Sequence, residues 1–255
     1  MTPSTPELER VSPEGGPITP GDLVVRVGRH PAAQLGLRLD FESRDTETAE
    51  TELERWLIAS CLFGGRASHD QALASARALE ACGASTPLGV VRLGIENLAE
   101  TLEKAGHSQP GAAAGLLARL ATVLVESEPG ILDAIGRDAE GLEELGSRLA
   151  ALAPGFGAAR VTRFLQPLRD TWPAAAELPL DPNACRAAFH LGWLGEEDDD
   201  PAALRATLEG ENPKAALADC EFALSEIGRR ACRRERPERC PLGPRCPRRP
   251  APTAS

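Results

Sequence analysis

The residues best suited to bind another molecule lie in the segment 153–165, APGFGAARVTRFL. Two glycines in this segment, Gly155 and Gly157, flank Phe156. Glycine at both positions allows positive φ angles and lets the backbone approach a ligand closely. The residues after Gly157 predict a helix, and the free N–H groups at its start favour an anion such as a phosphate. Because Gly-x-Gly is a short motif, an ordinary corner between two helices is the alternative.

Three thiols near the C terminus form a second group of residues that could do chemistry. Cys232, Cys240 and Cys246 lie within fifteen residues of one another, which chance explains poorly. Cysteines of a cytosolic chain are more often reduced thiols or metal ligands than disulfides. The spacing therefore indicates a metal site such as zinc on three cysteines, and a loop without metal is the alternative.

Composition and charge exclude several classes of protein. A chain of 255 residues is long enough for one large or two small domains. It contains no apolar run of about 18 residues, so we expect no membrane span. The N-terminal MTPSTPELER lacks the features of a secretory signal, so we expect a cytoplasmic location. The net charge of −10 argues against general nucleic-acid binding, but residues 220–255 carry nine arginines and four glutamates, the sign that phosphates attract.

Helical patterns dominate the chain and predict an all-α protein. Near the N terminus, LVVRV at 23–27 and the alternating LGLRLDF at 35–41 predict a short β-hairpin. Ser68 is a predicted helix N-cap. We predict a disordered arm with this hairpin at 1–45 and a helical domain at 46–231. A Cys-rich loop at 232–246 and a disordered basic tail at 247–255 follow.

Four segments, taken together, resemble the helix-hairpin-helix DNA glycosylases, and specifically the endonuclease III branch, from about Thr51 to Cys246. APGFGAARVTRFL is similar to the family hairpin, L-P-G-x-G-x-K-T-A. WPAAAELPLDPNACRAAFHLG is similar to the family's Gly/Pro-rich loop, aspartate and following helix, with Asp181 and Arg186 at the matching offsets. WLIASCLFGG resembles the first core helix, and DCEFALSEIGRRAC with CPLGPRC resembles the last helix and the closing cysteine loop.

The resemblance implies a fold of two all-α lobes with double-stranded DNA bound between them. In such proteins the hairpin amides bind a backbone phosphate, and a polar side chain after the first core helix fills the gap left by a flipped base. Here Arg66 stands in that second position. The DNA-binding residues predicted in this way are Gly155, Phe156, Gly157, Arg160, Arg66 and Arg186.

Asp181 is the predicted catalytic residue. Breaking an N-glycosidic bond builds positive charge on the sugar, and a nearby carboxylate stabilises that charge and can orient an attacking water. Because Asp181 precedes Pro182 and a predicted helix, a role as helix N-cap is the alternative, and it is compatible with catalysis.

The chain departs from the family pattern at two places. Bifunctional members carry a hairpin lysine that forms a Schiff base with the sugar, whereas this chain has Ala159 there, and its only lysines are Lys104 and Lys214. Lyase activity is therefore not expected. The family loop C-x6-C-x2-C-x5-C holds a [4Fe-4S] cluster on four thiolates, whereas this loop has three cysteines, so zinc or no metal are alternatives to the cluster.

The sequence therefore predicts a monomeric, nucleoid-associated protein of DNA base-excision repair, a monofunctional glycosylase without lyase activity. The alternative is a catalytically inactive DNA-binding or protein-interaction module on the same fold. Ala159, the missing fourth cysteine and the net charge of −10 favour the alternative, whereas Asp181 with Arg186 in register favours the glycosylase.

Overall fold

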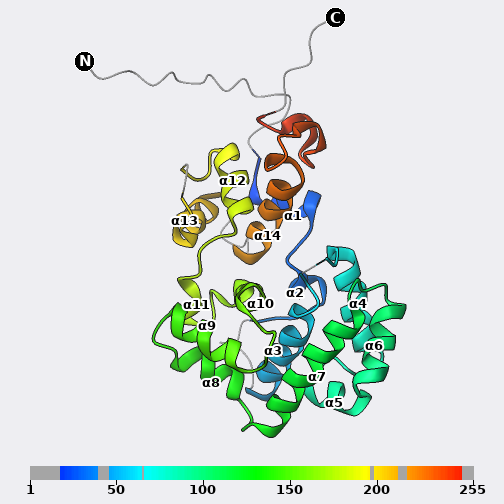
Figure 1. Cartoon of the computed structure of the whole chain (residues 1–255). Helices are drawn as coiled ribbons and strands as arrows, with labels where there is room; N and C mark the ends of the chain where they lie inside the picture. The colour runs from blue at the N-terminus through cyan, green and yellow to red at the C-terminus, as the bar shows by residue number, and fades with distance from the viewer. Residues whose placement is uncertain (1–17, 40–45, 65, 196–197, 212–216, 249–255) are drawn as a thin grey trace, which may run out of the picture. The chain divides into compact units, whose positions relative to one another are not determined.

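A computed structural model describes residues 18–39, 46–64, 66–195, 198–211 and 217–248 of the chain. These residues form helices and no β-strand, so the prediction of an all-α fold is confirmed (Figure 1). Contacts divide the chain into two compact units. We call residues 30–179 the hairpin unit, and residues 1–29 together with 180–255 the terminal unit.

The hairpin unit consists of consecutive helices joined by short turns (Figure 1). Its elements are α2 (Pro31–Gln34), α3 (Thr46–Ser60), α4 (His69–Ala81), α5 (Pro87–Leu93), α6 (Ile95–Lys104), α7 (Pro110–Glu126), α8 (Ile131–Asp138), α9 (Leu142–Ala151), α10 (Ala158–Leu165), the 3-10 turn η1 (Gln166–Leu168) and α11 (Pro173–Ala176). Ser68 caps α4 as predicted, because its hydroxyl accepts a hydrogen bond from the Gln71 N–H while the Gln71 side chain accepts one from the Ser68 N–H.

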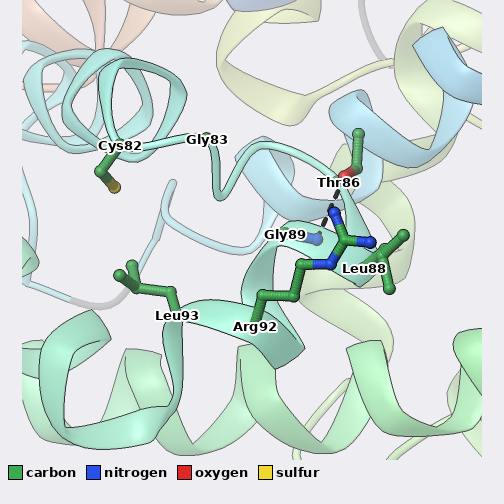
Figure 2. Close-up of a pocket in the computed structure, with 7 residues that line it drawn as sticks. All are labelled: Cys82, Gly83, Thr86, Leu88, Gly89, Arg92 and Leu93. Carbon is green, nitrogen blue, oxygen red and sulfur yellow. Dashed lines mark hydrogen bonds between the residues drawn. The ribbon is translucent and has the colours of Figure 1, made fainter.

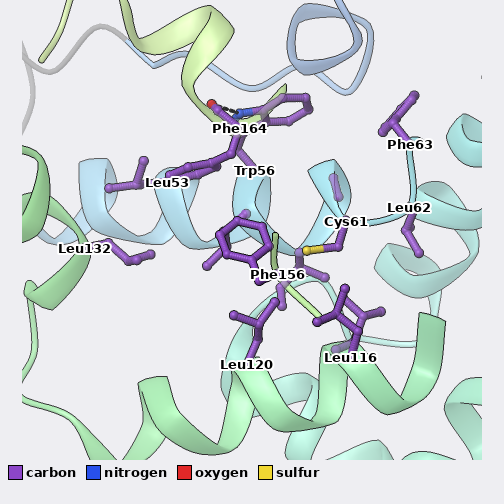
Figure 3. Packing of buried hydrophobic residues seen from close by; sticks show 14 of the residues in the cluster. Leu53, Trp56, Cys61, Leu62, Phe63, Leu116, Leu120, Leu132, Phe156 and Phe164 are labelled. Atoms are coloured by element: carbon purple, nitrogen blue, oxygen red, sulfur yellow. Dashed lines mark hydrogen bonds between the residues drawn. The ribbon is translucent and has the colours of Figure 1, made fainter. Parts of the chain in front are cut away.

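Helix α3 lies at the centre of the hairpin unit. Its residues Leu53, Trp56 and Leu57 are fully buried, and α3 packs against α4, α5, α8 and α10. The indole Nε1 of Trp56 donates a hydrogen bond of 2.9 Å to the main-chain oxygen of Phe164 in α10 (Figure 3). Burial of such large side chains contributes roughly 1.5–3 kcal/mol each, so α10 is held firmly on α3.

The terminal unit joins the two ends of the chain. Its elements are α1 (Pro20–Val27), α12 (Pro182–Leu191), α13 (Pro201–Glu211), α14 (Leu217–Ile227), the π-helical turn η2 (Gly228–Cys232), and the 3-10 turns η3 (Pro237–Arg239) and η4 (Gly243–Arg245). Helix α14 packs against α1, α12 and α13. Leu23 of α1 and Leu224 of α14 are both fully buried in the core of this unit.

The predicted N-terminal β-hairpin is wrong. Residues 23–27 lie in α1, and residues 35–39 form no strand, while residues 40 and 41 lie outside the described residues. The valines of this segment suggested a strand, but Thr19 and Asp22 form a capping box at 3.2 and 3.0 Å that starts a helix instead. Pro20 at the first helical position and the burial of Leu23 against α14 complete the preference for helix.

The predicted disordered ends fall mainly on residues 1–17 and 249–255, which lie outside the described residues. Within the described ranges, none of the helices combines the length and the apolar character that a membrane span requires.

Two carboxylates of α3, Glu50 and Glu54, have raised pKa values, and Glu50 lies next to the start of α8. The Glu50 carboxylate accepts hydrogen bonds from the N–H groups of Leu132 and Asp133, while burial raises its pKa. Burial, and then the negative charge of Glu50 one helical turn away, raise the pKa of Glu54 to about 7. In the unfolded chain the carboxyl would titrate near its ordinary value, so the folded chain retains a proton that the unfolded chain has lost.

We therefore expect the stability of the protein to fall as pH rises from about 4.5, through the window in which Glu54 loses its proton in the unfolded chain but not in the folded one. The substitution Glu54→Gln removes this loss. Thermal unfolding of the two proteins should show the variant gaining more in melting temperature over the wild type at pH 8 than at pH 4.5. An equal difference at both pH values would contradict the assignment.

Candidate functional site

The turn between α9 and α10 carries the predicted anion site. Gly155 has a φ of +97°, a conformation that favours glycine, as predicted. Gly157 differs from the prediction, because its φ of −83° with ψ of 178° is extended backbone. A Cβ added at Gly157 would meet no atom within 4 Å. Glycine is therefore not required at this position by the protein's own packing, and the space beside it is open.

The start of α10 presents unused hydrogen-bond donors. Gly157 is the N-cap and makes no side-chain capping bond. Inside the turn the Phe156 N–H donates to the Ala153 oxygen at 3.0 Å, whereas the N–H groups of Gly157, Ala158 and Ala159 have no acceptor among the described residues. Residues 153–160, together with Ala150, line a cavity of about 410 Å³ at this place. The helix dipole adds to the attraction of these donors for an anion.

Two guanidinium groups hold the carbonyl oxygens of the turn. Arg160, a predicted site residue, donates from Nη1 to the Gly155 oxygen at 2.9 Å. Arg119 of α7 donates from Nε to the Pro154 oxygen at 3.2 Å. Sequence reasoning missed Arg119, because it lies 35 residues from its partner and belongs to no motif. Only the packing of α7 under the turn brings it there.

Phe156 was predicted to bind DNA as part of the hairpin, whose amides bind a phosphate, and its side chain is buried. Its ring is 1% exposed and packs among core residues, including Leu116 and Leu120 of α7 (Figure 3). The ring centre lies 6.4 Å from that of Phe164. The side chain therefore anchors the turn, and only the backbone of this residue can face a ligand.

Arg66 is exposed in the segment after α3, and it has no hydrogen-bond or ion-pair partner among the described residues. The same segment is tied to α10, because Arg163 donates from Nη1 to the Phe63 oxygen. A Cβ added at Gly64 would lie 3.0 Å from that Nη1. The segment after α3 is thus linked to α10. The role of Arg66 in filling the gap left by a flipped base stays a prediction.

Asp181 lies in the terminal unit and caps α12. Its Oδ1 accepts hydrogen bonds from the N–H groups of Asn183 at 2.8 Å and Ala184 at 3.2 Å, as the alternative prediction required. Among the described residues Oδ2 has no hydrogen-bond partner, and the residue is half-buried. The Asp181 N–H donates to Oε1 of Glu221 at 2.9 Å. Glu221 is 1% exposed, and no sequence signal pointed to it.

Close packing of α12 on η2, the turn that follows α14, places the start of α12 and with it Asp181. A Cβ added at Gly228 would lie 2.0 Å from the main-chain oxygen of Asn183, so only glycine allows this approach. Asn183 is also one of the two residues whose N–H groups Asp181 caps.

The predicted basic residue of α12, Arg186, is exposed and lies near the cysteine loop, where its charge acts on Cys232 and His190. His190 Nε2 contacts Nη1 of Arg248 at 3.0 Å, while its Nδ1 is buried without a partner. Burial, followed by the charges of Arg248 and Arg186, lowers the pKa of His190. Arg186 thus lies in a basic group that includes Arg248.

The three loop cysteines, Cys232, Cys240 and Cys246, are the predicted metal ligands. A hydrogen bond with the Cys246 thiol, together with burial, raises the pKa of Cys240, and burial raises that of Cys232 to about 11. Across the described parts of the chain, no three His, Cys, Asp or Glu side chains are grouped so that they could hold a metal ion. The loop supplies three of the four thiolates that a [4Fe-4S] cluster takes, and a cluster or zinc at these residues stays a prediction.

A second cavity, of about 310 Å³, lies between the end of α4 and α5 (Figure 2). In its wall Thr86 Oγ1 accepts a hydrogen bond of 3.3 Å from the Gly89 N–H, and this bond caps the start of α5. None of the predicted site residues lines this cavity, so it belongs to no site inferred from the sequence.

Comparison with known proteins identified a solved structure that is similar to the chain, the 8-oxoguanine DNA glycosylase of Thermotoga maritima. The two sequences are 20% identical, the alignment covers 71% of this chain and 80% of that chain, and the TM-score is 0.42. No family model matches the chain, and no curated protein matches it significantly.

The cap at Asp181 gives the first prediction for this site. We expect Asp181→Ala to lower the free energy of unfolding by about 1 kcal/mol, because the N–H groups of Asn183 and Ala184 lose their acceptor. Asp181→Asn should keep most of this stability, since its amide oxygen accepts the same bonds. Urea unfolding of the three proteins measures the difference. Equal losses in both variants would contradict the capping role.

The close approach at Gly228 gives the second. Gly228→Ala should lower the free energy of unfolding by about 3 kcal/mol, because α12 and η2 must separate to admit the methyl group. Gly146→Ala is a suitable control, since Gly146 lies within α9 and its added Cβ would meet nothing within 4 Å. A Gly228 variant as stable as the Gly146 variant would show that the helices do not pack in this way.

Proposed function

We propose that this protein binds double-stranded DNA through the turn at residues 155–160 and hydrolyses the N-glycosidic bond of a flipped base, with Asp181 as the essential carboxylate. The observation that carries the proposal is the start of α10, where three free N–H groups, an exposed backbone and the Arg160 guanidinium line one cavity. A phosphate oxygen is the hydrogen-bond acceptor that suits such donors best.

The phosphate would bind the turn through main-chain donors. Gly157, Ala158 and Ala159 carry no side chain larger than a methyl group, so a DNA backbone can come close to their N–H groups. Binding of this kind is independent of sequence and weakens with salt. It positions the duplex and leaves the choice of base to other residues.

The carboxylate supports hydrolysis of a glycosidic bond. Capping of α12 uses Oδ1 of Asp181 and leaves Oδ2 free to face developing positive charge on a sugar. A fixed carboxylate oxygen in this role stabilises the transition state and can orient a water molecule for attack on C1′. The bond between C1′ and the base nitrogen breaks, the water oxygen bonds to C1′, and the base leaves with a proton.

Lyase chemistry is not part of the proposal. The hairpin position that would carry the amine is Ala159, and Lys104 is paired with Glu100 at 2.6 Å on α6. Lys214 lies outside the described residues. Arginine cannot replace a lysine here, because its guanidinium stays protonated and does not form a Schiff base.

The alternative function is a DNA-binding module without catalysis. It is favoured by the capping bonds of Asp181, because an N-cap alone explains an aspartate at this position. This alternative keeps the phosphate site of the turn and removes the chemical step.

A glycosylase assay decides between these functions. Duplexes that each carry one damaged or mismatched base are incubated with the protein and then treated with alkali, which cleaves at abasic sites. We expect cleavage on at least one duplex, and a loss of roughly 100-fold or more in rate in Asp181→Asn, which keeps the helix cap.

The matched control is Asp200→Asn. Asp200 also precedes a proline, and its Oδ1 also accepts a hydrogen bond at a helix start, from the Ala202 N–H at 2.8 Å. It should leave the rate unchanged. Tight DNA binding without cleavage of any duplex would support the non-catalytic alternative, and absence of DNA binding at low salt would rule out both.

A further inference from the structure

Arg119 reaches the hairpin turn from a different helix. It is an exposed residue of α7, and its Nε donates to the Pro154 oxygen at 3.2 Å. Hydrogen bonds from a charged donor are roughly twice as strong as neutral ones. This contact joins the turn to α7, whereas the other guanidinium of the turn, Arg160, belongs to α10 itself.

Two glycines lie beside the Arg119 guanidinium. A Cβ added at Gly115, one helical turn earlier on α7, would lie 3.4 Å from Nη1. A Cβ added at Gly155 would lie 3.6 Å from Nη2. The guanidinium therefore lies close along the backbone of the turn, beside the residue whose φ of +97° creates the bend.

The two guanidiniums have different places relative to the anion cavity. Arg160 lines the cavity of about 410 Å³, and Arg119 does not. Arg119 holds the carbonyl of Pro154, the residue just before the bend. A carbonyl fixed in this way cannot turn toward an incoming phosphate, where its negative end would repel the anion.

We propose that Arg119 is a positioning residue for anion binding: it holds the turn so that the N–H groups of residues 157–159 stay directed toward a DNA phosphate, and it does not contact that phosphate itself. The inference rests on the proposed function for its ligand. The holding of the turn by Arg119 is independent of DNA, and it can be measured without DNA.

The test uses Arg119→Met, Arg119→Lys and Arg160→Met, with Arg77→Met as the control for an exposed arginine on α4. Amide hydrogen exchange over residues 153–161 is measured without DNA. Affinity for a plain duplex is measured from 50 to 200 mM salt, the range in which phosphate contacts are lost. Thermal unfolding checks that each variant is folded.

In Arg119→Met we expect exchange of the hydrogen-bonded amides of this segment, those of Phe156, Arg160 and Val161, and the DNA dissociation constant each to rise about tenfold, the effect of losing one charge-assisted hydrogen bond. The salt dependence should keep its wild-type slope, whereas Arg160→Met should lower the slope by about one. Arg119→Lys should restore most of the protection, because its ammonium can donate to the same oxygen. Arg77→Met should match the wild type.

Two results would overturn the proposal. Unchanged exchange of the turn in Arg119→Met would show that Arg119 does not hold it. A slope reduced by about one in that variant would show that Arg119 contacts a phosphate directly. If the wild type binds no DNA, the proposed function fails, and the exchange measurement alone decides whether Arg119 holds the turn.

Discussion

The burial of Phe156 is the constraint on which the candidate interface depends. Its ring is inside the core of the hairpin unit, while Gly155 and Gly157 on either side are exposed. An apolar anchor of this size draws the turn onto α7 and leaves only backbone outside. The hydrogen bond from Trp56 to the Phe164 oxygen fixes α10 in the same core. The donors at the start of α10 are thus presented on a rigid base.

Guanidinium groups fasten the carbonyl oxygens around this base. Arg119, Arg160 and Arg163 donate to the oxygens of Pro154, Gly155 and Phe63. The chain is acidic overall, with a net charge of −10, yet two arginines, Arg119 and Arg160, lie at its hairpin turn. Attraction for a phosphate depends on the charges within roughly one Debye length, about 8–10 Å in physiological salt, so the total charge is a poor guide to this surface.

In the terminal unit several contacts likewise fix the position of Asp181. One carboxylate oxygen caps α12, the N–H of the same residue donates to the buried Glu221, and Gly228 lets η2 approach α12 closely. At the other end of the unit, Asp22 of α1 binds Arg245 of the cysteine loop at 3.0 Å. That hydrogen bond is the main reason that the pKa of Asp22 falls to about 2. The N-terminal helix is therefore an integral part of the fold.

The sequence by itself determined the all-α class, the caps at Ser68 and Asp181, and the bend at Gly155, because local hydrogen bonding and φ preferences decide these features within a few residues. It misjudged 23–27, where β-branched residues suggested a strand. The burial of the Phe156 side chain was not predicted, because no local pattern revealed it. Only the tertiary structure brought Arg119 to Pro154 and Glu221 to Asp181, since these contacts join residues 35 and 40 positions apart. Such contacts depend on how whole helices pack, which local sequence does not encode.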